Sequence, residues 1–266
     1  MHAMNLARAT SLVAFTVLTA SANASLLAGA DFSTYTDGAL VGQSGWAQYN
    51  TSSTAPLTVS SGRVSWAGNG NTAANNQDAL LAFANQITQP LSGETVLNFD
   101  IVMSVASAGA SPSYFAALNT LTTTTTSGNF QNVRMVAKAN GAGFSFGTRL
   151  NGQGGYPFSY GTQVLNFGQT YALRAEIHLV AGNANDFINL YVGDDFNNLA
   201  LHATAGYTTG SVNDISVGGM LLSQFASSSA FESGVSISSM SVSLVPAPGA
   251  IALLGFAGLA GARRRR

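Results

Sequence analysis

Large apolar residues recur at every second position over long stretches of this chain, and this spacing restricts what it can fold into. The clearest run lies between residues 95 and 105, where apolar residues alternate with Asn98, Asp100 and Ser104. The apolar members are Leu97, Phe99, Ile101, Met103 and Val105. Successive side chains of a strand point to opposite faces, so the pattern predicts a strand with one buried and one polar face.

Turn-forming residues separate other runs of the same kind. Ser61-Gly62 divides Val59 from Val64, and Asn-Gly-Ala-Gly at 140–143 divides two longer alternating runs. Small residues in these places predict antiparallel hairpins. Many evenly spaced strands in a chain without a sustained helical pattern predict an all-β fold, a two-sheet antiparallel sandwich of the jelly-roll type.

The last alternating run changes phase along its length. Val235 and Ile237 occupy odd positions, whereas the apolar residues from Met240 to Leu244 occupy even ones. A shift by one residue moves a side chain to the opposite face of the sheet. The sequence therefore predicts a β-bulge near Ser238-Ser239.

The stretch from Asp31 to Trp46, together with the closing strand at 236–244, resembles the two ends of concanavalin A/laminin G-like domains. The residues that carry this resemblance are Asp31-Phe32, the glycine-containing segment from Gly38 to Gly45, and Trp46. The resemblance implies that the first and last strands pair side by side and that Trp46 packs under the first loop. It implies no binding residues.

The first 24 residues have the three parts of a secretory signal peptide. Arg8 precedes an apolar run at 12–18, and the segment closes on Ala22-Asn23-Ala24 before Ser25. We expect residues 1–24 to engage the secretion machinery and to be removed by signal peptidase before Ser25. An uncleaved N-terminal anchor is the alternative.

The last 22 residues, 245–266, consist of three blocks. Val245-Pro246-Ala247-Pro248 is followed by an apolar run from Gly249 to Ala262 and by Arg263, Arg264, Arg265 and Arg266. The prolines end the preceding strand, and the apolar run predicts a hydrophobic helix suited to lipid. About fourteen residues span ~21 Å, which is short for a bilayer core of ~30 Å. The arginines would remain on the cytoplasmic side as a membrane-stop cluster.

This ending resembles the PEP-CTERM sorting signal of bacteria that make exopolysaccharide. The resemblance covers residues 245–266, with Ala247 in the place where the family usually has Glu. It implies that an exosortase-type membrane protease recognises the motif and removes the helix and the arginines. The chain would then be exported through the inner membrane, anchored there transiently, and released to the cell surface or beyond it. A plain C-terminal membrane anchor is the alternative.

Between these ends, residues 25–244 form the predicted sandwich domain, whose charge is uneven. The segment from Ser25 to Val245 contains all eleven acidic residues but only five basic ones, a formal net charge of −6 against −1 for the whole chain. The basic residues are Arg63, Arg134, Lys138, Arg149 and Arg174. This balance argues against a nucleic-acid partner. The absence of cysteine excludes disulfides and thiol chemistry.

The acidic residues show no glycosidase signature. Such an enzyme needs two carboxylates that face each other across a cleft. None of Glu94, Glu176 and Glu232 has an acidic residue two or four positions later. Asp194 and Asp195 are adjacent and would point to opposite faces of a strand. We therefore expect no enzymatic activity and assign no catalytic residue.

Arg174, Glu176 and His178 alternate along one run and would share a face. They could form a polar site, or a solvated sheet face with a weak ion pair. His178 and His202 are the histidines of the domain, and without cysteine they make a zinc site improbable.

Calcium is the ion that the loop residues suit best, and we expect no other cofactor. Asn183, Asn185 and Asp186 precede one strand, and Asp194 and Asp195 follow it, so each group could offer hard oxygen ligands. Ordinary turn chemistry is the alternative, because Asn and Asp are common in turns.

Three aromatic residues, Tyr156, Phe158 and Tyr160, follow the glycine-rich segment at 152–155 and could stack on sugars. Packing in the core is the alternative. The tail and the missing carboxylate pair predict an exported, non-enzymatic protein of the cell surface or extracellular matrix. It would act there as a structural or carbohydrate-contacting sandwich, with exopolysaccharide as the partner in the second case. The competing hypothesis is a glycoside hydrolase on a jelly-roll scaffold that acts on extracellular polysaccharide.

Overall fold

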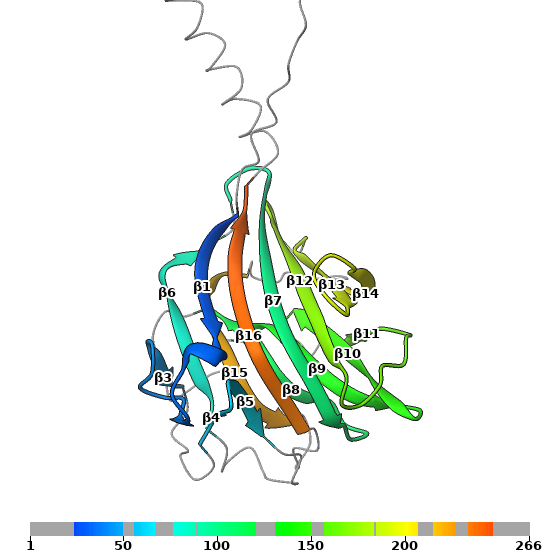
Figure 1. Cartoon of the computed structure of the whole chain (residues 1–266). Coiled ribbons are helices and arrows are strands. Elements are labelled where there is room, and N and C mark those ends of the chain that lie inside the picture. The colour runs from blue at the N-terminus through cyan, green and yellow to red at the C-terminus, as the bar shows by residue number, and fades with distance from the viewer. Residues whose placement is uncertain are drawn as a thin grey trace, which may run out of the picture. The chain divides into compact units, whose positions relative to one another are not determined.

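A computed structural model describes residues 24–49, 56–66, 77–88, 90–120, 131–150, 157–183, 185–206, 215–226 and 234–246. Residues Ala24–Val245 form one compact unit. Within it two antiparallel sheets pack against each other, as Figure 1 shows. The predicted all-β, two-sheet antiparallel sandwich is therefore confirmed.

The larger sheet has nine strands, in the order β14-β13-β12-β7-β16-β5-β4-β2, with β1 paired to β16 as well. Its strands are β1 (Ser25–Asp31), β2 (Gly38–Ala39), β4 (Thr58–Ser60), β5 (Arg63–Trp66), β7 (Glu94–Ser107), β12 (Thr170–Val180), β13 (Phe187–Gly193), β14 (Ala200–Gly206) and β16 (Gly234–Val245). A short 3-10 turn, η1 (Phe32–Thr34), follows β1.

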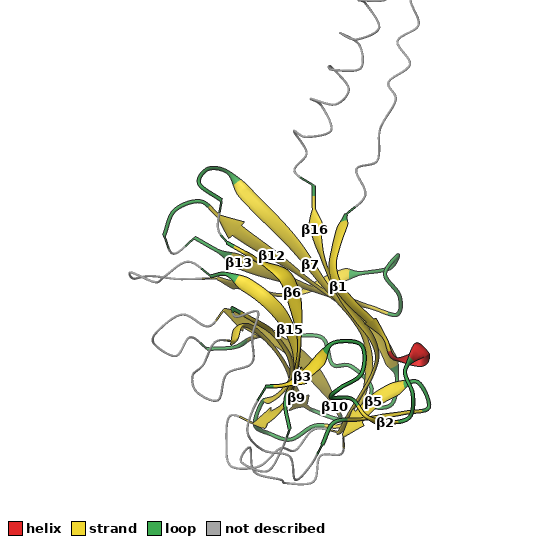
Figure 2. Ribbon diagram, turned by 90° about the vertical axis from the view of Figure 1, so that its left-hand side faces the viewer, coloured by secondary structure: helices red, strands yellow, loops and turns green. Residues whose placement is uncertain are grey.

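The smaller sheet has seven strands, in the order β11-β10-β9-β8-β15-β6-β3. Its strands are β3 (Trp46–Gln48), β6 (Ala79–Ile87), β8 (Ser113–Asn119), β9 (Gln131–Asn140), β10 (Gly143–Leu150), β11 (Ser159–Tyr160) and β15 (Val217–Ala226). The long strands of the nine-stranded sheet curve over this sheet in Figure 2.

The hydrophobic core lies between the sheets and follows the alternation seen in the sequence. Every second residue of β7 from Leu97 to Val105 is completely buried, whereas Asn98, Asp100 and Ser104 between them are partly exposed. β12 repeats the pattern from Tyr171 to Leu179. All the residues of the main core cluster belong to the compact unit, so we expect the unit to fold on its own.

The two ends of the unit lie on neighbouring strands. β1 pairs antiparallel with β16, and Ser25 is opposite Leu244. Trp46 is buried beside Phe32 of the first loop, with ring centroids 6.1 Å apart, and its Nε1 donates to Tyr35 Oη at 3.2 Å. Both structural expectations from the concanavalin A/laminin G-like resemblance are therefore confirmed.

The phase change in the last run is a β-bulge. The register of β16 against β7 shifts between Ile237 and Ser239. On its other edge, β16 pairs with β5 before this point and with β1 after it. Ser238 Oγ donates to the carbonyl of Val102 at 3.1 Å, so the hydroxyl bonds to the neighbouring strand at the irregularity. The predicted bulge is confirmed.

Both predicted hairpins are present. β4 and β5 are joined by Ser61 and Gly62, which have φ angles of 51° and 74°. This left-handed pair is typical of the tight turns that match the twist of the flanking strands. β9 and β10 are joined through Gly141, with φ at 59°.

The predicted leader and most of the tail lie outside the described residues. These segments are 1–23 and 247–266, and they include Ala22, Ala247, Pro248 and the arginine cluster. β16 ends at Val245, directly before Pro246, as expected of a residue that cannot donate to a ladder. Within the described ranges, no helix is long and apolar enough to cross a membrane.

Candidate functional site

Three of the five basic residues of the domain lie on one face of the seven-stranded sheet. Arg134 and Lys138 are on β9, and Arg149 is on β10. On β9 they alternate with Val133, Met135 and Ala137, which belong to the core between the sheets. The three cations therefore point away from the core, on the outer face of the sheet.

Arg134 and Arg149 are directly opposite each other across the β9–β10 pair. Arg134 is 4% exposed, and its Nη1 donates to Tyr114 Oη at 3.4 Å. Burial, and then the charge of Arg149, lower the pKa of Arg134 from its ordinary value. A guanidinium has so high an ordinary pKa that it stays charged at neutral pH, so this face holds two adjacent positive charges.

Each of the three cations lies over an aromatic ring. The guanidinium carbon of Arg134 is 5.1 Å from the ring centroid of Tyr114, and that of Arg149 is 4.6 Å from that of Phe158. Lys138 Nζ is 5.3 Å from the centroid of Tyr160. These are cation–π distances. We call the set Tyr114, Arg134, Lys138, Arg149, Phe158 and Tyr160 the basic–aromatic face.

The three rings follow one another across this face. The centroid of Phe158 is 5.5 Å from that of Tyr114 and 6.1 Å from that of Tyr160. Tyr160 is partly buried, and this burial is the main cause that raises the pKa of its hydroxyl to about 12. A phenol is protonated at neutral pH even at its ordinary pKa, so the Tyr160 hydroxyl can donate a hydrogen bond.

Gly147 makes room for the ring of Tyr160. The two residues are opposite each other on β10 and β11. A Cβ built at Gly147 would lie 2.6 Å from Tyr160 Cδ1 and 3.0 Å from Val136 Cγ2. A larger residue at this position would push the Tyr160 ring off the sheet, so Gly147 is part of what places it.

The chain contains one G-x-S-x-G sequence, from Gly143 to Gly147, and it lies inside β10. A serine nucleophile with this motif sits on a sharp turn between a strand and a helix, which is not the conformation here. Ser145 Oγ accepts from Asn140 Nδ2 at 2.7 Å and donates to the carbonyl of Gln163 at 2.9 Å. These contacts indicate a structural hydroxyl.

A second polar cluster lies on the outer face of the nine-stranded sheet. His178 stacks on Phe187 with centroids 4.0 Å apart. Its Nδ1 is 2.5 Å from Glu94 Oε1, and its Nε2 is 3.6 Å from Glu176 Oε1. The imidazole therefore occupies the space between the two carboxylates. A glycosidic bond could not be placed between them, as a hydrolytic acid pair requires.

Arg174 shares this face, as the alternation predicted, and forms a two-pronged ion pair with Asp100. The distances are 2.7 Å from Nε to Oδ1 and 2.8 Å from Nη2 to Oδ2. The hydrogen bond to Asp100 is the main cause that raises the pKa of Arg174. The guanidinium carbon also lies 5.5 Å from the ring centroid of Phe196. This geometry is tighter than the weak surface pair considered from the sequence.

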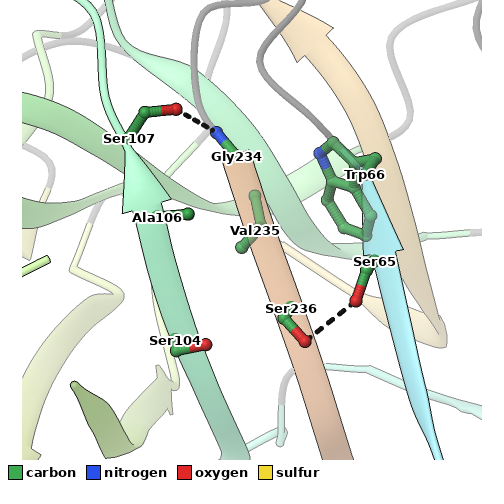
Figure 3. Close-up of a pocket in the computed structure, with 8 residues that line it drawn as sticks. All are labelled: Ser65, Trp66, Ser104, Ala106, Ser107, Gly234, Val235 and Ser236. Carbon is green, nitrogen blue, oxygen red and sulfur yellow. Dashed lines mark hydrogen bonds between the residues drawn. The ribbon is translucent and has the colours of Figure 1, made fainter. Parts of the chain in front are cut away.

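A shallow hollow of about 450 Å³ lies elsewhere on the nine-stranded sheet, between β5, β16 and β7 (Figure 3). Its polar side chains are mostly serines, and three of their hydroxyls bond to other groups of the hollow. The Oγ atoms of Ser65 and Ser236 are 2.9 Å apart, and the N–H of Gly234 donates to Ser107 Oγ at 3.0 Å. It has no charged lining residue, so it is a weaker candidate than the basic–aromatic face.

The residues suggested for calcium do not come together. Asn183, Asn185 and Asp186 precede β13, whereas Asp194 and Asp195 follow it. A strand of this length spans about 23 Å, so the two groups cannot bind one ion. Within the described part of the chain no three acidic or histidine side chains form a group that could hold a metal.

The hydrogen bonds of these residues belong to turns and loops. Asp186 is 1% exposed and accepts from the backbone N–H groups of Val180 at 2.8 Å and Ile215 at 3.1 Å. Asn185 Nδ2 donates to the carbonyl of Ala181 at 2.8 Å. Asp194 Oδ1 accepts from Gln169 Nε2 at 2.8 Å.

The Asp195 side chain also forms hydrogen bonds within its own turn. Its Oδ1 accepts from the backbone N–H groups of Asn197 at 2.7 Å and Asn198 at 3.0 Å. Asn183 lies in the turn after β12. A calcium ion at either end of β13 stays a prediction.

Of the aromatic residues named from the sequence, Phe158 and Tyr160 lie on the basic–aromatic face, and Tyr156 lies outside the described residues. Sequence reasoning missed Tyr114 and the three cations of this face. A signal was present, because three of the five basic residues of the domain fall between residues 134 and 149. Arg134 and Lys138 also occupy even positions of their strand, whereas the apolar core residues occupy odd ones. Their spacing therefore puts both cations on the face away from the core.

No protein-family model matches the chain, and no curated protein does. Solved structures do match in fold. An alginate lyase, Aly36B, solved as a mutant in complex with an alginate trisaccharide, is 14% identical and has a TM-score of 0.50. The match covers 84% of this chain and 99% of that one.

Two further structures give a similar picture. A bifunctional GH43-CE protein of Bacteroides eggerthii is 12% identical with a TM-score of 0.50, over 82% of this chain but only 26% of that one. The Emp47p carbohydrate recognition domain is 10% identical with a TM-score of 0.47, over 84% of this chain and 97% of that one. At these identities the similarity concerns the fold alone.

Proposed function

We propose that this chain is an exported protein of the cell surface or extracellular matrix that binds polysaccharide without cleaving it. The observation that carries the proposal is the basic–aromatic face, where the partly exposed rings of Phe158 and Tyr160 lie beside the partly exposed cations Arg149 and Lys138. Aromatic rings offer flat apolar surfaces, and the hydroxyls and cations around them offer hydrogen bonds. A sugar ring has apolar faces and a hydroxyl rim, so it matches both features.

The fold is compatible with this role. The alginate lyase that shares the two-sheet architecture was solved with an alginate trisaccharide, so a polysaccharide can be accommodated by this scaffold. The comparison supports only the class of ligand, because a fold can host many functions.

The non-enzymatic part of the proposal rests on the described carboxylates. Glu94 and Glu176 have the imidazole of His178 between them, and Asp100 is held by Arg174. Asp186 binds two backbone N–H groups. Asp100 shares a shallow hollow on the nine-stranded sheet with Asp31, but both carboxylates already accept hydrogen bonds there, Asp100 from Arg174 and Asp31 from Ser33. Neither is arranged as a free acid of a hydrolytic pair. A glycoside hydrolase remains the competing function, and release of reducing ends from a polysaccharide would favour it.

Export and sorting are proposed from the ends of the sequence. The signal peptide and the PEP-CTERM-like tail flank a unit whose first and last strands are adjacent, with Ser25 opposite Leu244. The leader and the tail would therefore both be joined to the sandwich at neighbouring strands, β1 and β16. We propose signal peptidase and an exosortase-type protease as the processing partners.

Binding is tested with residues 25–245, passed over exopolysaccharide of the producing organism with calcium and, separately, with a chelator. Saturable retention in both conditions supports the proposal, and retention only with calcium adds an ion to the site. A chain that is not retained in either condition, while its melting curve shows that it is folded, contradicts polysaccharide binding.

Sorting is tested separately by deleting residues 245–266 and by replacing Pro246 and Pro248 with Ala. Cell fractions and culture medium are then probed for the protein and its size. We expect the intact chain to lose its tail and reach the surface or medium, whereas the Ala variant stays in the membrane fraction at full length. If the intact chain and the Ala variant are processed identically, sorting does not depend on the motif.

A further inference from the structure

We infer that the ligand of the basic–aromatic face is an acidic polysaccharide whose sugars carry carboxylate groups. The inference rests on the proposed function, because it names the chemical class of the sugar bound there. It is carried by the positions of Arg134, Lys138 and Arg149 on one sheet face.

These three cations lie together on one face of a domain whose net charge is negative. Basic residues are outnumbered eleven to five between Ser25 and Val245, yet three of the five share this face. Arg134 and Arg149 are directly opposite each other, and like charges in this position are unfavourable. Burial of Arg134 adds to the cost of its charge. A bound carboxylate would turn this repulsion into attraction to a shared anion.

The chemistry of the cations fits a carboxylate. A guanidinium has five N–H donors in a fixed plane and binds a carboxylate through two parallel hydrogen bonds. In this structure the guanidinium carbons of Arg134 and Arg149 lie over the rings of Tyr114 and Phe158. Such ring contacts restrain the side chains, so less freedom is lost when a ligand binds.

The extent of the face fits a chain of sugars. Arg134 and Lys138 are four residues apart on β9, or about 13 Å along the strand. The rings of Tyr114, Phe158 and Tyr160 extend across the same region in steps of 5.5 Å and 6.1 Å. Tyr114 and Arg134 are only 3% and 4% exposed. The partly exposed members of the face, Lys138, Arg149, Phe158 and Tyr160, are the ones that can contact consecutive sugar units.

The test is isothermal titration calorimetry of residues 25–245 with three chains: polygalacturonate, which carries carboxylates, a neutral β-glucan, and dextran sulfate. The variant is Lys138→Gln combined with Arg149→Gln, because both side chains are partly exposed. The matched control is Arg63→Gln, which removes a positive charge from β5 of the other sheet. Melting temperatures show that each variant is folded.

We expect polygalacturonate to bind the unaltered protein more tightly than either other chain. The double variant should lose about tenfold or more in affinity for it, because two charge-assisted contacts are removed. Arg63→Gln should change the affinity less than about twofold, because Arg63 is partly exposed and lies on the other sheet, away from the face.

Different failures have different meanings. If none of the three chains binds, the proposed function itself is wrong. If the β-glucan binds as tightly as polygalacturonate, or the double variant binds polygalacturonate normally, polysaccharide binding stands and the acidic ligand is wrong. If dextran sulfate binds equally well, or Arg63→Gln weakens binding as much as the double variant, the carboxylate assignment at this face is overturned.

Discussion

Arg134 and Arg149 face each other across strands β9 and β10, so the most buried basic residue of the domain has another guanidinium as its cross-strand neighbour. A sheet selected only for stability would place an acidic or neutral residue in one of these positions. If the face binds an acidic ligand as we propose, the arrangement trades some stability of the free protein for that function.

The first prediction concerns this trade. Arg149→Gln removes the repulsion with Arg134 but also the contact with the ring of Phe158. The two effects are each about 0.5–1 kcal/mol and of opposite sign. We expect the free energy of unfolding in urea to change by less than about 1 kcal/mol.

Salt should distinguish the variant from the parent. Repulsion between the arginines is weakened by added salt, so the parent should gain more stability than Arg149→Gln between about 0.01 M and 0.5 M salt. An equal gain in both proteins would show that the two guanidinium groups do not repel each other measurably.

The second prediction concerns Asp100 and Arg174. Asp100→Ala should lower the free energy of unfolding by about 1–2 kcal/mol, because a two-pronged, partly buried ion pair is lost and Arg174 remains. Arg174→Ala combined with Asp100→Ala should cost less than the sum of the single changes. The pair lies on the other sheet, so binding of polygalacturonate should not change. A double variant whose cost equals that sum would mean that the pair contributes nothing.

Most of the fold could be predicted because strand periodicity is a local signal. The alternation of β7 fixes which side chains enter the core, and the phase change in β16 locates the bulge at Ser238. The stretch Ala79 to Asn85 is less informative, because its apolar residues do not alternate, and it forms part of strand β6. Strand order within each sheet depends on pairings between distant segments and could not be derived from any local pattern.

The candidate site was less predictable for the same reason. Its residues come from separate strands: Tyr114 is on β8, Arg149 is on β10, and Phe158 directly precedes β11. Only the order of the strands in the sheet brings them together. The suggested calcium ligands illustrate the opposite error. Asp186 and Asp194 are close in sequence, but the extended strand between them places them at opposite ends of β13.

The third prediction concerns Asp186. Asp186→Ala should cost about 3 kcal/mol of stability, because two backbone N–H groups in buried or partly buried positions lose their acceptor. This cost is measured by urea unfolding of the parent and of Asp186→Ala. Unfolding both proteins with calcium and with a chelator also tests the calcium prediction. Calcium that stabilises the parent but not Asp186→Ala would place an ion at this end of β13. A cost below about 0.5 kcal/mol would contradict the structural role.

The fourth prediction concerns Gly147. Gly147→Ala should cost about 1–3 kcal/mol and weaken polysaccharide binding, because the new methyl group collides with the ring of Tyr160 and with Val136. The matched control is Gly29→Ala, whose Cβ would meet its nearest neighbours at 3.6 Å, an ordinary contact distance. That variant should stay within about 0.5 kcal/mol of the parent. Equal effects of the two changes, measured by urea unfolding and calorimetry, would show that Gly147 does not place the ring.

The last prediction concerns His202 and pH. Its Nε2 is buried without a hydrogen-bond partner in the described structure, and the ring packs against Gly161 so closely that a Cβ there would collide with it. Burial lowers the pKa of His202 from its ordinary value, and a hydrogen bond with the backbone of Phe146 opposes that shift only in part.

The sign of the pH effect follows from these protonation states. Well above the ordinary histidine pKa of about 6.5, His202 is neutral in the folded and unfolded chain, so its contribution to stability is constant. Below that pH the unfolded chain takes up the proton first, so stability falls until the lower pKa of the folded state is reached. The contribution of His202 is isolated by comparison with His202→Gln. Between about pH 8 and pH 5, the melting temperature of the parent should fall more than that of His202→Gln. Parallel curves for the two proteins would show that the imidazole is not held in its neutral form, and that the packing around Gly161 leaves it open to protonation.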